Sequence, residues 1–540
     1  MQTQSRLLPA LGRAACLVVL GAALSGCAGK AMVKENYDKP ASVALPAPAA
    51  TAVAASVAPV AAARAESNQS GFRLLTLNTN GLMSRLVLAD KAERSIDLQY
   101  YIFRNDNTGK LVAQHLLAAA DRGVRVRMLI DDVPSGEAKP MFDALDAHAN
   151  IEVRRFNPFN THQPNAISRA AQMLLEFRRL NRRMHNKSFI VDNKVAVIGG
   201  RNIADDYFNA GEDHNFRDLD LLAVGPVVAQ ASKSFDAYWN DEASVPSGAY
   251  LAAKNSEADI AALRTELSRH AKEYAQSEYV QDAAQDLPAG PTADRGGQWF
   301  WGPATLVADQ PEKIQEGDDQ PGLAIAPAVF GIVDAATTDV TMVSPYFVPS
   351  ADEDKLFVKL LDRKTRVRLV TNSLAGTDEP AVHTGYAPHR RLLLEHGAEI
   401  YELKPHAGRK LSEAERGNDA IFGLHAKAIV VDARYTFIGS MNMDQRSKLL
   451  NTEMGLVVDS PGLAKATLDY FNTLRQPANA YQVMLSGKDE DGDGQGEGVF
   501  LRWKTEEDGK PVVIKHEPEA GVLRRAEVIL LNLLPIDGLL

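Results

Sequence analysis

A duplicated motif constrains this chain more than any other feature of its sequence. The segment 185–192 has the pattern H-x-K-x-x-x-x-D, and the segment 425–432 repeats it. In each copy an asparagine, Asn202 or Asn442, follows the histidine by 17 residues. One copy can arise by chance in a chain of 540 residues, but two copies with the same downstream spacing indicate a duplicated unit. We therefore expect two related halves that each contribute a histidine, a lysine and an asparagine.

Both copies have the pattern of a β-hairpin. The apolar, β-branched runs Ser188–Val191 and Ala428–Val431 are each followed by three turn residues and a second apolar run. Side chains alternate faces along a strand, so the histidine and the lysine of each motif share one face. The motif aspartates, Asp192 and Asp432, then fall on the other face or in the turn. We expect these aspartates to support the hairpin while the histidine and lysine point into a cavity.

Paired histidines, lysines and asparagines around one cavity suit a phosphodiester. Lysine charge and amide donors stabilise the non-bridging oxygens. One neutral histidine can attack phosphorus and form a phosphohistidine, while the other protonates the leaving oxygen and later deprotonates the incoming nucleophile. An acid should orient each histidine ring, and the candidates each stand eight residues before a proline. The predicted site residues are His185, Lys187, Asp192, Asn202 and Asp218 in the first half, and His425, Lys427, Asp432, Asn442 and Glu453 in the second.

A zinc site does not fit these motifs, because each holds a single histidine beside a lysine whose charge opposes a cation. A chain that kept only the fold would need the glycines and apolar strands. It would not need both histidines, both lysines, both asparagines and both acids.

These duplicated motifs are HKD motifs, and on them the chain resembles the phospholipase D superfamily from about residue 71 to the end. The segments 371–386, 393–403 and 501–536 resemble bacterial cardiolipin synthases of the C type. The resemblance implies a phosphatidyltransferase that makes cardiolipin by transfer to phosphatidylglycerol, with no metal or organic cofactor. It favours His185 as the nucleophile, a choice that the residues themselves leave open.

Three alternatives remain at this point. Water as the acceptor would make the chain a phospholipase D-type hydrolase or a nuclease. The net charge of −10 and the pI near 5.7 disfavour a nucleic-acid partner. The third alternative is a non-catalytic lipid-binding protein of the cell envelope. The expected partner is a phospholipid membrane that supplies phosphatidylglycerol, with phosphatidylethanolamine as a second candidate substrate, and the oligomeric state stays open.

The pattern of elements predicts an α/β fold with two similar halves around a pseudo-twofold and the active site at the seam. Each half begins with a strand, a helix and a second strand. In the first half these are 96–103, 111–120 and 124–130, and in the second half 340–347, 355–361 and 366–370. We place the first half at 71–245, a connector with a helix at 257–274 at 246–320, the second half at 321–485, and a C-terminal strand and apolar tail at 486–540.

The N-terminus has the pattern of a lipoprotein signal peptide over residues 1–26. A basic start precedes an apolar run that is too short to span a membrane, and the run ends in Leu24-Ser25-Gly26-Cys27, which resembles a lipobox. Cys27 is then the expected lipid-attachment site, and a plain signal peptide or an uncleaved anchor is the alternative. Ala28, in place of an aspartate, implies the outer membrane by default. The Ala/Pro-rich stretch that completes 27–70 predicts a disordered tether.

Two further segments have apolar and basic residues together. The run 167–184 carries five arginines among apolar residues and predicts a basic amphipathic helix that seats anionic headgroups, or else an ordinary solvated helix face. The tail 522–540 carries Arg524 and Arg525 beside an apolar cluster. It either enters a bilayer or packs on the catalytic body.

Overall fold

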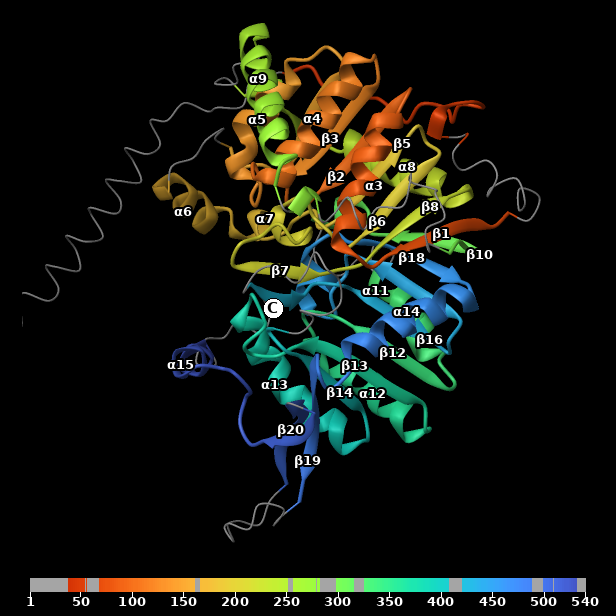
Figure 1. Cartoon of the computed structure of the whole chain (residues 1–540), viewed down its shortest axis with the longest axis vertical. Coiled ribbons are helices and arrows are strands. Elements are labelled where there is room, and N and C mark those ends of the chain that lie inside the picture. The colour runs from red at the N-terminus through yellow and green to blue at the C-terminus, as the bar shows by residue number, and fades with distance from the viewer. Residues whose placement is uncertain are drawn as a thin grey trace, which may run out of the picture.

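The chain folds into two lobes stacked along its long axis (Figure 1). The computed structural model describes residues 37–53, 55, 68–160, 166–250, 256–277, 279–281, 298–314, 325–406, 420–487, 499–507 and 509–531. The N-terminal part of the chain forms the first lobe, and the C-terminal part forms the second lobe.

A nine-stranded sheet forms the centre of the first lobe. Its strand order is β10 (Phe300–Gly302), β1 (Ser70–Leu75), β8 (Asp220–Val224), β6 (Val195–Gly199), β5 (Ser188–Val191), β2 (Ser95–Tyr100), β3 (Arg125–Asp131), β4 (Ile151–Phe156) and β9 (Ser244–Pro246). Four helices pack on its outer face, and one packs on the face toward the second lobe. The outer helices are α3 (Asn78–Lys91), α4 (Asn107–Asp121), α5 (Lys139–Asp146) and α9 (Glu257–Tyr274), and the inner helix is α8 (Pro226–Asn240).

A ten-stranded sheet forms the centre of the second lobe. Its strand order is β11 (Ala304–Ala308), β18 (Met454–Asp459), β17 (Tyr435–Gly439), β16 (Ala428–Val431), β12 (Asp339–Val343), β13 (Arg366–Asn372), β14 (Glu399–Leu403), β19 (Ala480–Ser486), β20 (Phe500–Glu507) and β21 (Lys510–Ile514). Its core helices are α11 (Ile325–Asp334), α12 (Ala351–Asp362) and α13 (Pro380–Glu395) on the outer side and α14 (Pro461–Leu474) on the inner side, and α15 (Val522–Leu531) follows β21.

The two sheets repeat one topology, which confirms the predicted duplication. The order β8-β6-β5-β2-β3-β4-β9 corresponds strand for strand to β18-β17-β16-β12-β13-β14-β19. The predicted hairpins are β5–β6 and β16–β17, and the predicted β-α-β units are present in both lobes. The connector contains the predicted helix α9, and it also supplies β10 to the first sheet and β11 to the second.

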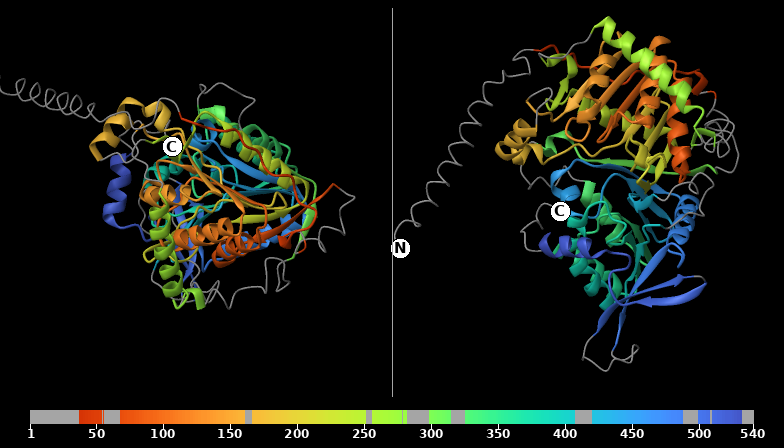
Figure 2. Two further views of the ribbon diagram at one scale, coloured as in Figure 1. Left: turned by 90° about the horizontal axis from the view of Figure 1, so that it is seen from above. Right: turned by 60° about the vertical axis from the view of Figure 1, so that its left-hand side comes forward.

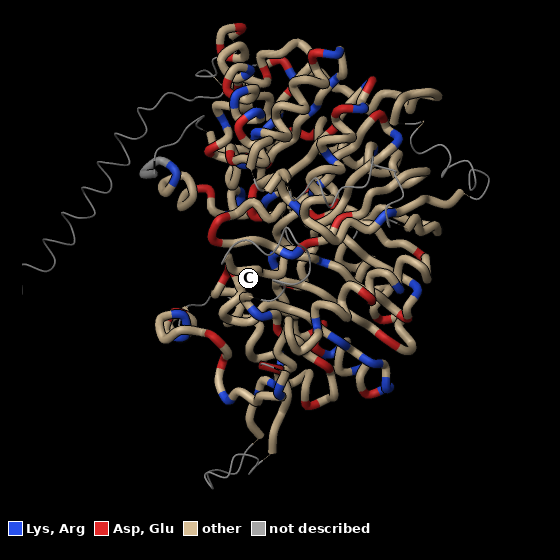
Figure 3. Tube along the Cα trace, in the orientation of Figure 1, with Lys and Arg blue, Asp and Glu red and all other residues tan. Residues whose placement is uncertain are grey.

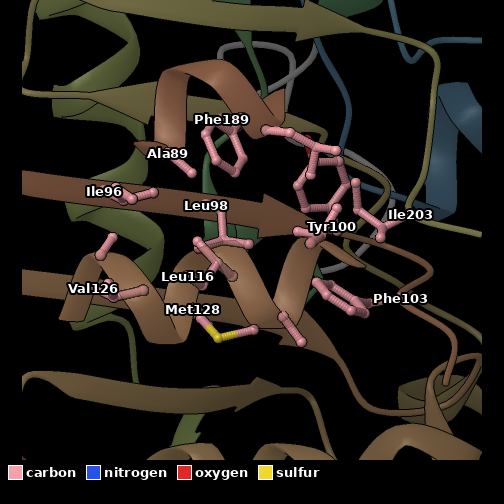
Figure 4. Close-up of a cluster of buried hydrophobic side chains, with 14 of the residues drawn as sticks. Ala89, Ile96, Leu98, Tyr100, Phe103, Leu116, Val126, Met128, Phe189 and Ile203 are labelled. Carbon is pink, nitrogen blue, oxygen red and sulfur yellow. The ribbon is translucent and has the colours of Figure 1, made fainter. Parts of the chain in front are cut away.

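Apolar side chains fill both faces of the sheets. In the first lobe Ile96, Leu98 and Tyr100 occupy every second position of β2 and so share one face. They pack in one cluster with Leu116 of α4 and Ala89 of α3 (Figure 4). A second cluster combines buried residues of both lobes, including Ile190 of β5 and Val430 of β16. Burial of apolar area is the main favourable term in folding, so this shared cluster holds the two lobes together.

Residues 37–53 cross the first lobe instead of forming part of a disordered tether. The buried Arg127 donates to the Ser42 carbonyl at 3.0 Å, and the buried Arg154 donates to the Pro40 carbonyl at 2.8 Å. A buried guanidinium needs acceptors for its several N–H groups, and this segment provides some of them. Residues 1–36, with the predicted signal peptide, Cys27 and Ala28, lie outside the described residues.

The predicted basic helix over 167–184 is broken in two. The structure has α6 (Ala166–Leu175) and α7 (Phe177–Leu180), with Glu176 between them in a non-helical conformation. The Glu176 carboxylate accepts hydrogen bonds from Arg179 at 2.7 Å and from Asn160 at 2.8 Å. These contacts fix the break, and α7 then leads toward the first motif.

No helix within the described ranges is long and apolar enough to cross a membrane.

The motif aspartates close the turns of the two hairpins. Asp192 is buried, has a φ of 51°, and accepts from the backbone N–H groups of Glu93, Arg94 and Ser95 at 3.2, 2.8 and 3.0 Å. Asp432 has the same φ and accepts from Thr337, Thr338 and Asp339 at 2.9, 2.8 and 3.0 Å. Each aspartate therefore ties its hairpin to the start of the neighbouring strand, β2 or β12.

Replacement of Asp192 by alanine should lower the free energy of unfolding by about 1–3 kcal/mol, because three backbone N–H groups, one of them the buried N–H of Ser95, lose a charged acceptor. Denaturant or thermal unfolding measures this change. Asp469→Ala, which removes an exposed pair with Lys465 on α14, is the control and should change the free energy by less than about 0.5 kcal/mol. Equal effects from the two variants would contradict the role given to Asp192.

Candidate active site

Backbone segments of the two lobes pair across the seam and bring the two motifs together. β7 (His214–Arg217) of the first lobe runs parallel to β15 (Ile421–Leu424) of the second, just before the second motif. The His425 N–H donates to the Arg217 carbonyl at 2.8 Å. At the equivalent place the His185 N–H donates to the Thr452 carbonyl at 2.9 Å. Each motif histidine is thus hydrogen-bonded to the residue that precedes the acid of the other lobe.

The side chains follow the same cross-lobe arrangement. His185 Nδ1 lies 2.9 Å from a Glu453 carboxylate oxygen, and His425 Nδ1 lies 2.5 Å from an Asp218 carboxylate oxygen. Both acids are fully buried, and the histidines are 7% and 5% exposed. A carboxylate accepts the proton of Nδ1, which leaves a lone pair on the outward-facing Nε2. Each ring is therefore set in the tautomer that a nucleophile or a general base requires.

The motif lysines lie behind the histidines. Lys187 Nζ donates to the His185 carbonyl at 2.6 Å, and Lys427 Nζ donates to the His425 carbonyl at 2.5 Å. Both lysines are buried. One such bond leaves further ammonium protons available to an anion.

The two asparagines have free side-chain atoms inside the fold. Asn202 Oδ1 accepts from the Ile102 N–H at 3.1 Å, while its Nδ2 is buried and has no hydrogen-bond partner among the described residues. Asn442 likewise has a buried Oδ1 without a partner there. Buried polar atoms are rarely left unpaired, so these atoms indicate a place for a polar ligand. An amide whose oxygen and nitrogen are exchanged would present a donor at Asn442 as well.

Aromatic rings and one arginine complete the surroundings of the histidines. Tyr101 contacts the His185 ring edge-on at a centroid distance of 5.0 Å. Tyr207 and Phe216 contact the His425 ring at the same distance. Arg446 donates to the Asn181 side chain at 2.8 Å and so joins the lobes beside His185. Sequence reasoning missed these four residues, because the duplication does not repeat them: Asp206 stands in the first half where Arg446 stands in the second.

A buried ion pair fixes the approach to the first motif. Arg183 Nη2 lies 2.6 Å from Asp131, and the same carboxylate accepts from the Met184 N–H at 3.0 Å. Asp131 ends β3, so this pair connects the central sheet to the residue next to His185. In the sequence this pair is marked only by Asp131-Asp132, two acids at the end of an apolar strand and outside both motifs.

The two half-sites differ in how they hold their acids. Ser440 donates to the Glu453 carboxylate at 2.5 Å. The matching position in the first half is Gly200, where an added Cβ would come within 2.1 Å of an Asp218 oxygen. A short acid thus packs against a glycine in one half, and a longer acid is held by a serine in the other.

Burial and charge shift the pKa values of these groups in different directions. Burial, with the neighbouring lysines, lowers the pKa of His425 to about 4 and that of His185 well below its usual value. Burial opposes ionisation of Asp218, but His425 and Lys427 outweigh it and lower the pKa of this acid to about 2. Burial raises the pKa of Glu453 to about 7. Both histidines are therefore neutral near pH 7 in the free site.

Within the part of the chain that the structure describes, no group of three or more His, Cys, Asp or Glu residues is arranged to hold a metal ion.

The fold and the site together define a phospholipase D-like protein. The profile of the family described as "Cardiolipin synthase, PLD-like domain" matches residues 86–239 and 330–475. The chain belongs to this family.

Individual proteins agree with this assignment. Cardiolipin synthase C of Escherichia coli is 36% identical over 475 residues, which cover 87% of this chain and 96% of that protein. Cardiolipin synthase of Clostridium perfringens is 27% identical over 400 residues, which cover 74% of this chain and 69% of that protein. The crystal structure of phosphatidylserine synthase from Haemophilus influenzae has the same fold, with a TM-score of 0.54 at 13% identity, over 87% of this chain and 95% of that chain.

Substitution of Gly200 by alanine should displace the Asp218 carboxylate and lower phosphodiesterase activity about 100-fold, because a displacement near 1 Å has that cost. The rate on bis(p-nitrophenyl) phosphate measures it. Gly331→Ala in α11, where an added Cβ meets nothing within 4 Å, should leave the rate unchanged. Full activity of the Gly200 variant would show that Asp218 does not need its observed position.

The activity of the enzyme should decrease at alkaline pH. Burial lowers the pKa of Lys427 to about 8, so the lysine is charged below that pH and loses its proton above it. The rate constant kcat/KM on the same substrate should fall above about pH 8 and approach a tenfold loss per pH unit. Lys355→Gln, at a 77% exposed side chain, should leave the profile unchanged. A rate that still rises at pH 9 would exclude a need for the lysine charge.

Proposed function

We propose that this protein is a phosphatidyltransferase that makes cardiolipin by transferring a phosphatidyl group to phosphatidylglycerol through a phosphohistidine. The observation that carries the proposal is the crossed pairing of His185 with Glu453 and of His425 with Asp218, between two buried lysines. The 36% identity to cardiolipin synthase C over most of both chains supports the lipid substrate.

In the first step the Nε2 of one histidine, His185 in our proposal, attacks the phosphorus of the donor lipid. The bond from phosphorus to the leaving alcohol breaks, and His425 gives its Nε2 proton to that oxygen. The anionic phosphodiester raises the pKa of His425 when it binds, because opposite charge favours the protonated ring. The carboxylate of Asp218 stabilises the same imidazolium.

In the second step His425 removes a proton from a hydroxyl of phosphatidylglycerol. That oxygen attacks the phosphohistidine, the phosphorus–nitrogen bond breaks, and His185 is released. Lys187, Lys427, Asn202 and Asn442 donate to the non-bridging oxygens in both steps. Aromatic rings contact both histidines, and the site residues are almost fully buried, which limits the water that competes with the lipid hydroxyl.

We propose further that the protein is held at a bacterial envelope membrane by lipid attachment at Cys27. The support is the pattern Leu24-Ser25-Gly26-Cys27 after a basic start and an apolar run. Ala28 favours the outer membrane over retention at the inner membrane. From Cys27 to Tyr37, where the described chain meets the first lobe, ten residues reach at most about 35 Å.

The test incubates the protein with vesicles of labelled phosphatidylglycerol, with and without phosphatidylethanolamine, and identifies the lipid products by mass spectrometry. Wild type should produce cardiolipin. His185→Ala and His425→Ala should each reduce the rate by at least about 1000-fold, because each removes a group needed for bond making or proton transfer. His115→Ala, which removes a surface histidine paired with Asp90, should retain the wild-type rate.

The products separate the alternatives. Phosphatidic acid in place of cardiolipin would make the protein a hydrolase. Lipid binding without turnover, unchanged in His185→Ala, would make it a lipid-binding protein of the envelope.

A further inference from the structure

The helices α6 and α7 present apolar side chains to solvent. Leu174 and Leu175 are each 81% exposed, and Phe177 is 43% exposed. None of the three belongs to the buried hydrophobic clusters of the first lobe. Scattered exposed apolar residues are common on protein surfaces, but a cluster on a projecting element marks an interaction site.

The helix α15 repeats this feature on the second lobe. Val522 and Leu523 are 83% and 87% exposed, Ile529 and Leu530 are each 64% exposed, and none of the ten residues of the helix is buried.

Polar contacts hold α15 with its apolar residues outward. Arg524 donates to the carbonyls of Leu374 and Thr377, at the start of the loop before α13. Arg525 donates to the Glu517 carbonyl at 2.8 Å. The arginines therefore help to fix the helix to the second lobe, where it lies against α13, and its four most exposed apolar side chains stay outward.

These two projecting elements lie on one side of the molecule. Figure 2 shows α6 and α15 on the same side in both views, one on each side of the seam. Together with α7, these two helices carry seven of the eleven large hydrophobic side chains that are exposed in the described part of the chain. We name these seven side chains the apolar rim.

The apolar rim borders the active site. On the first lobe, α7 ends at Leu180, five residues before His185. On the second lobe, the loop that Arg524 holds continues to Asp378, whose charge is close enough to the motif residue Lys427 to oppose the lowering of its pKa by burial. The rim thus belongs to the elements that lead to the site from both lobes.

Basic side chains accompany the apolar rim although the chain as a whole is acidic. Arg169 of α6, Arg178 of α7 and Arg525 of α15 are exposed, and Figure 3 shows basic residues on both projecting elements. The net charge of the chain is −10. Apolar side chains together with arginine on a projecting helix match the interface of an anionic membrane, where the former enter the acyl boundary and the latter contact phosphates.

We propose that the apolar rim docks on the surface of a bilayer that contains anionic phospholipid and so sets the active site over the lipid headgroups. This inference rests on the proposed function only in its choice of a lipid surface as the occupant. Docking through both lobes brings a headgroup to the seam while the acyl chains stay in the membrane. The tether from Cys27 keeps the protein near the surface, and the rim orients it there.

The test places an environment-sensitive fluorophore at single cysteines in the full chain. Cys16 and Cys27 are the only native cysteines, so serine at both leaves a background without thiols or lipid attachment. The labelled variants are Leu175→Cys and Leu530→Cys, and Val513→Cys on β21 is the matched control, because Val513 is 53% exposed but lies outside the rim. The fluorophore is nitrobenzoxadiazole, and the probe is vesicles of phosphatidylglycerol and phosphatidylcholine.

Both rim positions should shift their emission to shorter wavelength when vesicles are added, and the Val513 position should not. The shift should also occur in a His425→Ala background, so docking is measured without turnover and a failure of the proposed function is seen separately. Unchanged emission at both rim positions, or an equal shift at Val513, would overturn the proposal. A shift that depends on protein concentration without vesicles would instead assign the rim to contacts between two copies of the chain.

A second measurement compares turnover on vesicles with turnover on short-chain phosphatidylglycerol dissolved as monomers. In Leu175→Glu/Leu523→Glu the ratio of the two rates should fall at least about tenfold, because two apolar side chains no longer enter the acyl boundary. Misfolding would lower both rates together and leave their ratio unchanged. The control variant Val513→Glu should also have the wild-type ratio. A ratio equal to that of wild type would overturn the proposal.

Discussion

Backbone hydrogen bonding across the seam is the interaction on which the site depends. The segment before each motif pairs with the segment before the acid of the other lobe, through His185 to Thr452 and through His425 to Arg217. This pairing places each acid beside the histidine of the opposite half. Neither lobe contains a complete pair, so the chemistry requires both lobes in register. The cluster of apolar residues shared by the two sheets stabilises that register.

The duplication does not make the two half-sites equivalent. Asp218 packs against Gly200, whereas Glu453 accepts from Ser440. Their charge states diverge accordingly, with the pKa of Asp218 lowered to about 2 and that of Glu453 raised to about 7. Pairs of titratable groups with divergent pKa values are a common basis for dividing acid and base roles. A duplicated site therefore has the asymmetry that a nucleophile and a proton donor need.

The sequence predicted most of the fold and the members of the site, because repetition at fixed spacing selects the histidines, lysines and asparagines. It did not assign each acid to its histidine, since that pairing depends on how the lobes pack. Arg446 and Tyr101 escaped notice because no duplicated residue supports them.

Tertiary contacts also overrode two local patterns. The basic helix expected over 167–184 breaks at Glu176, whose carboxylate binds Arg179. Part of the expected tether is held by the buried Arg127 and Arg154.

Nuclear magnetic resonance of nitrogen-labelled histidine tests the crossed pairing most directly. The account predicts that Asp218→Asn changes the Nδ1 resonance and titration of His425 and leaves those of His185 unchanged, while Glu453→Gln has the opposite pattern. If Asp218→Asn changed the resonances of His185 alone, or of neither histidine, the result would contradict the crossed pairing. The acid of one lobe would then not be the partner of the histidine of the other.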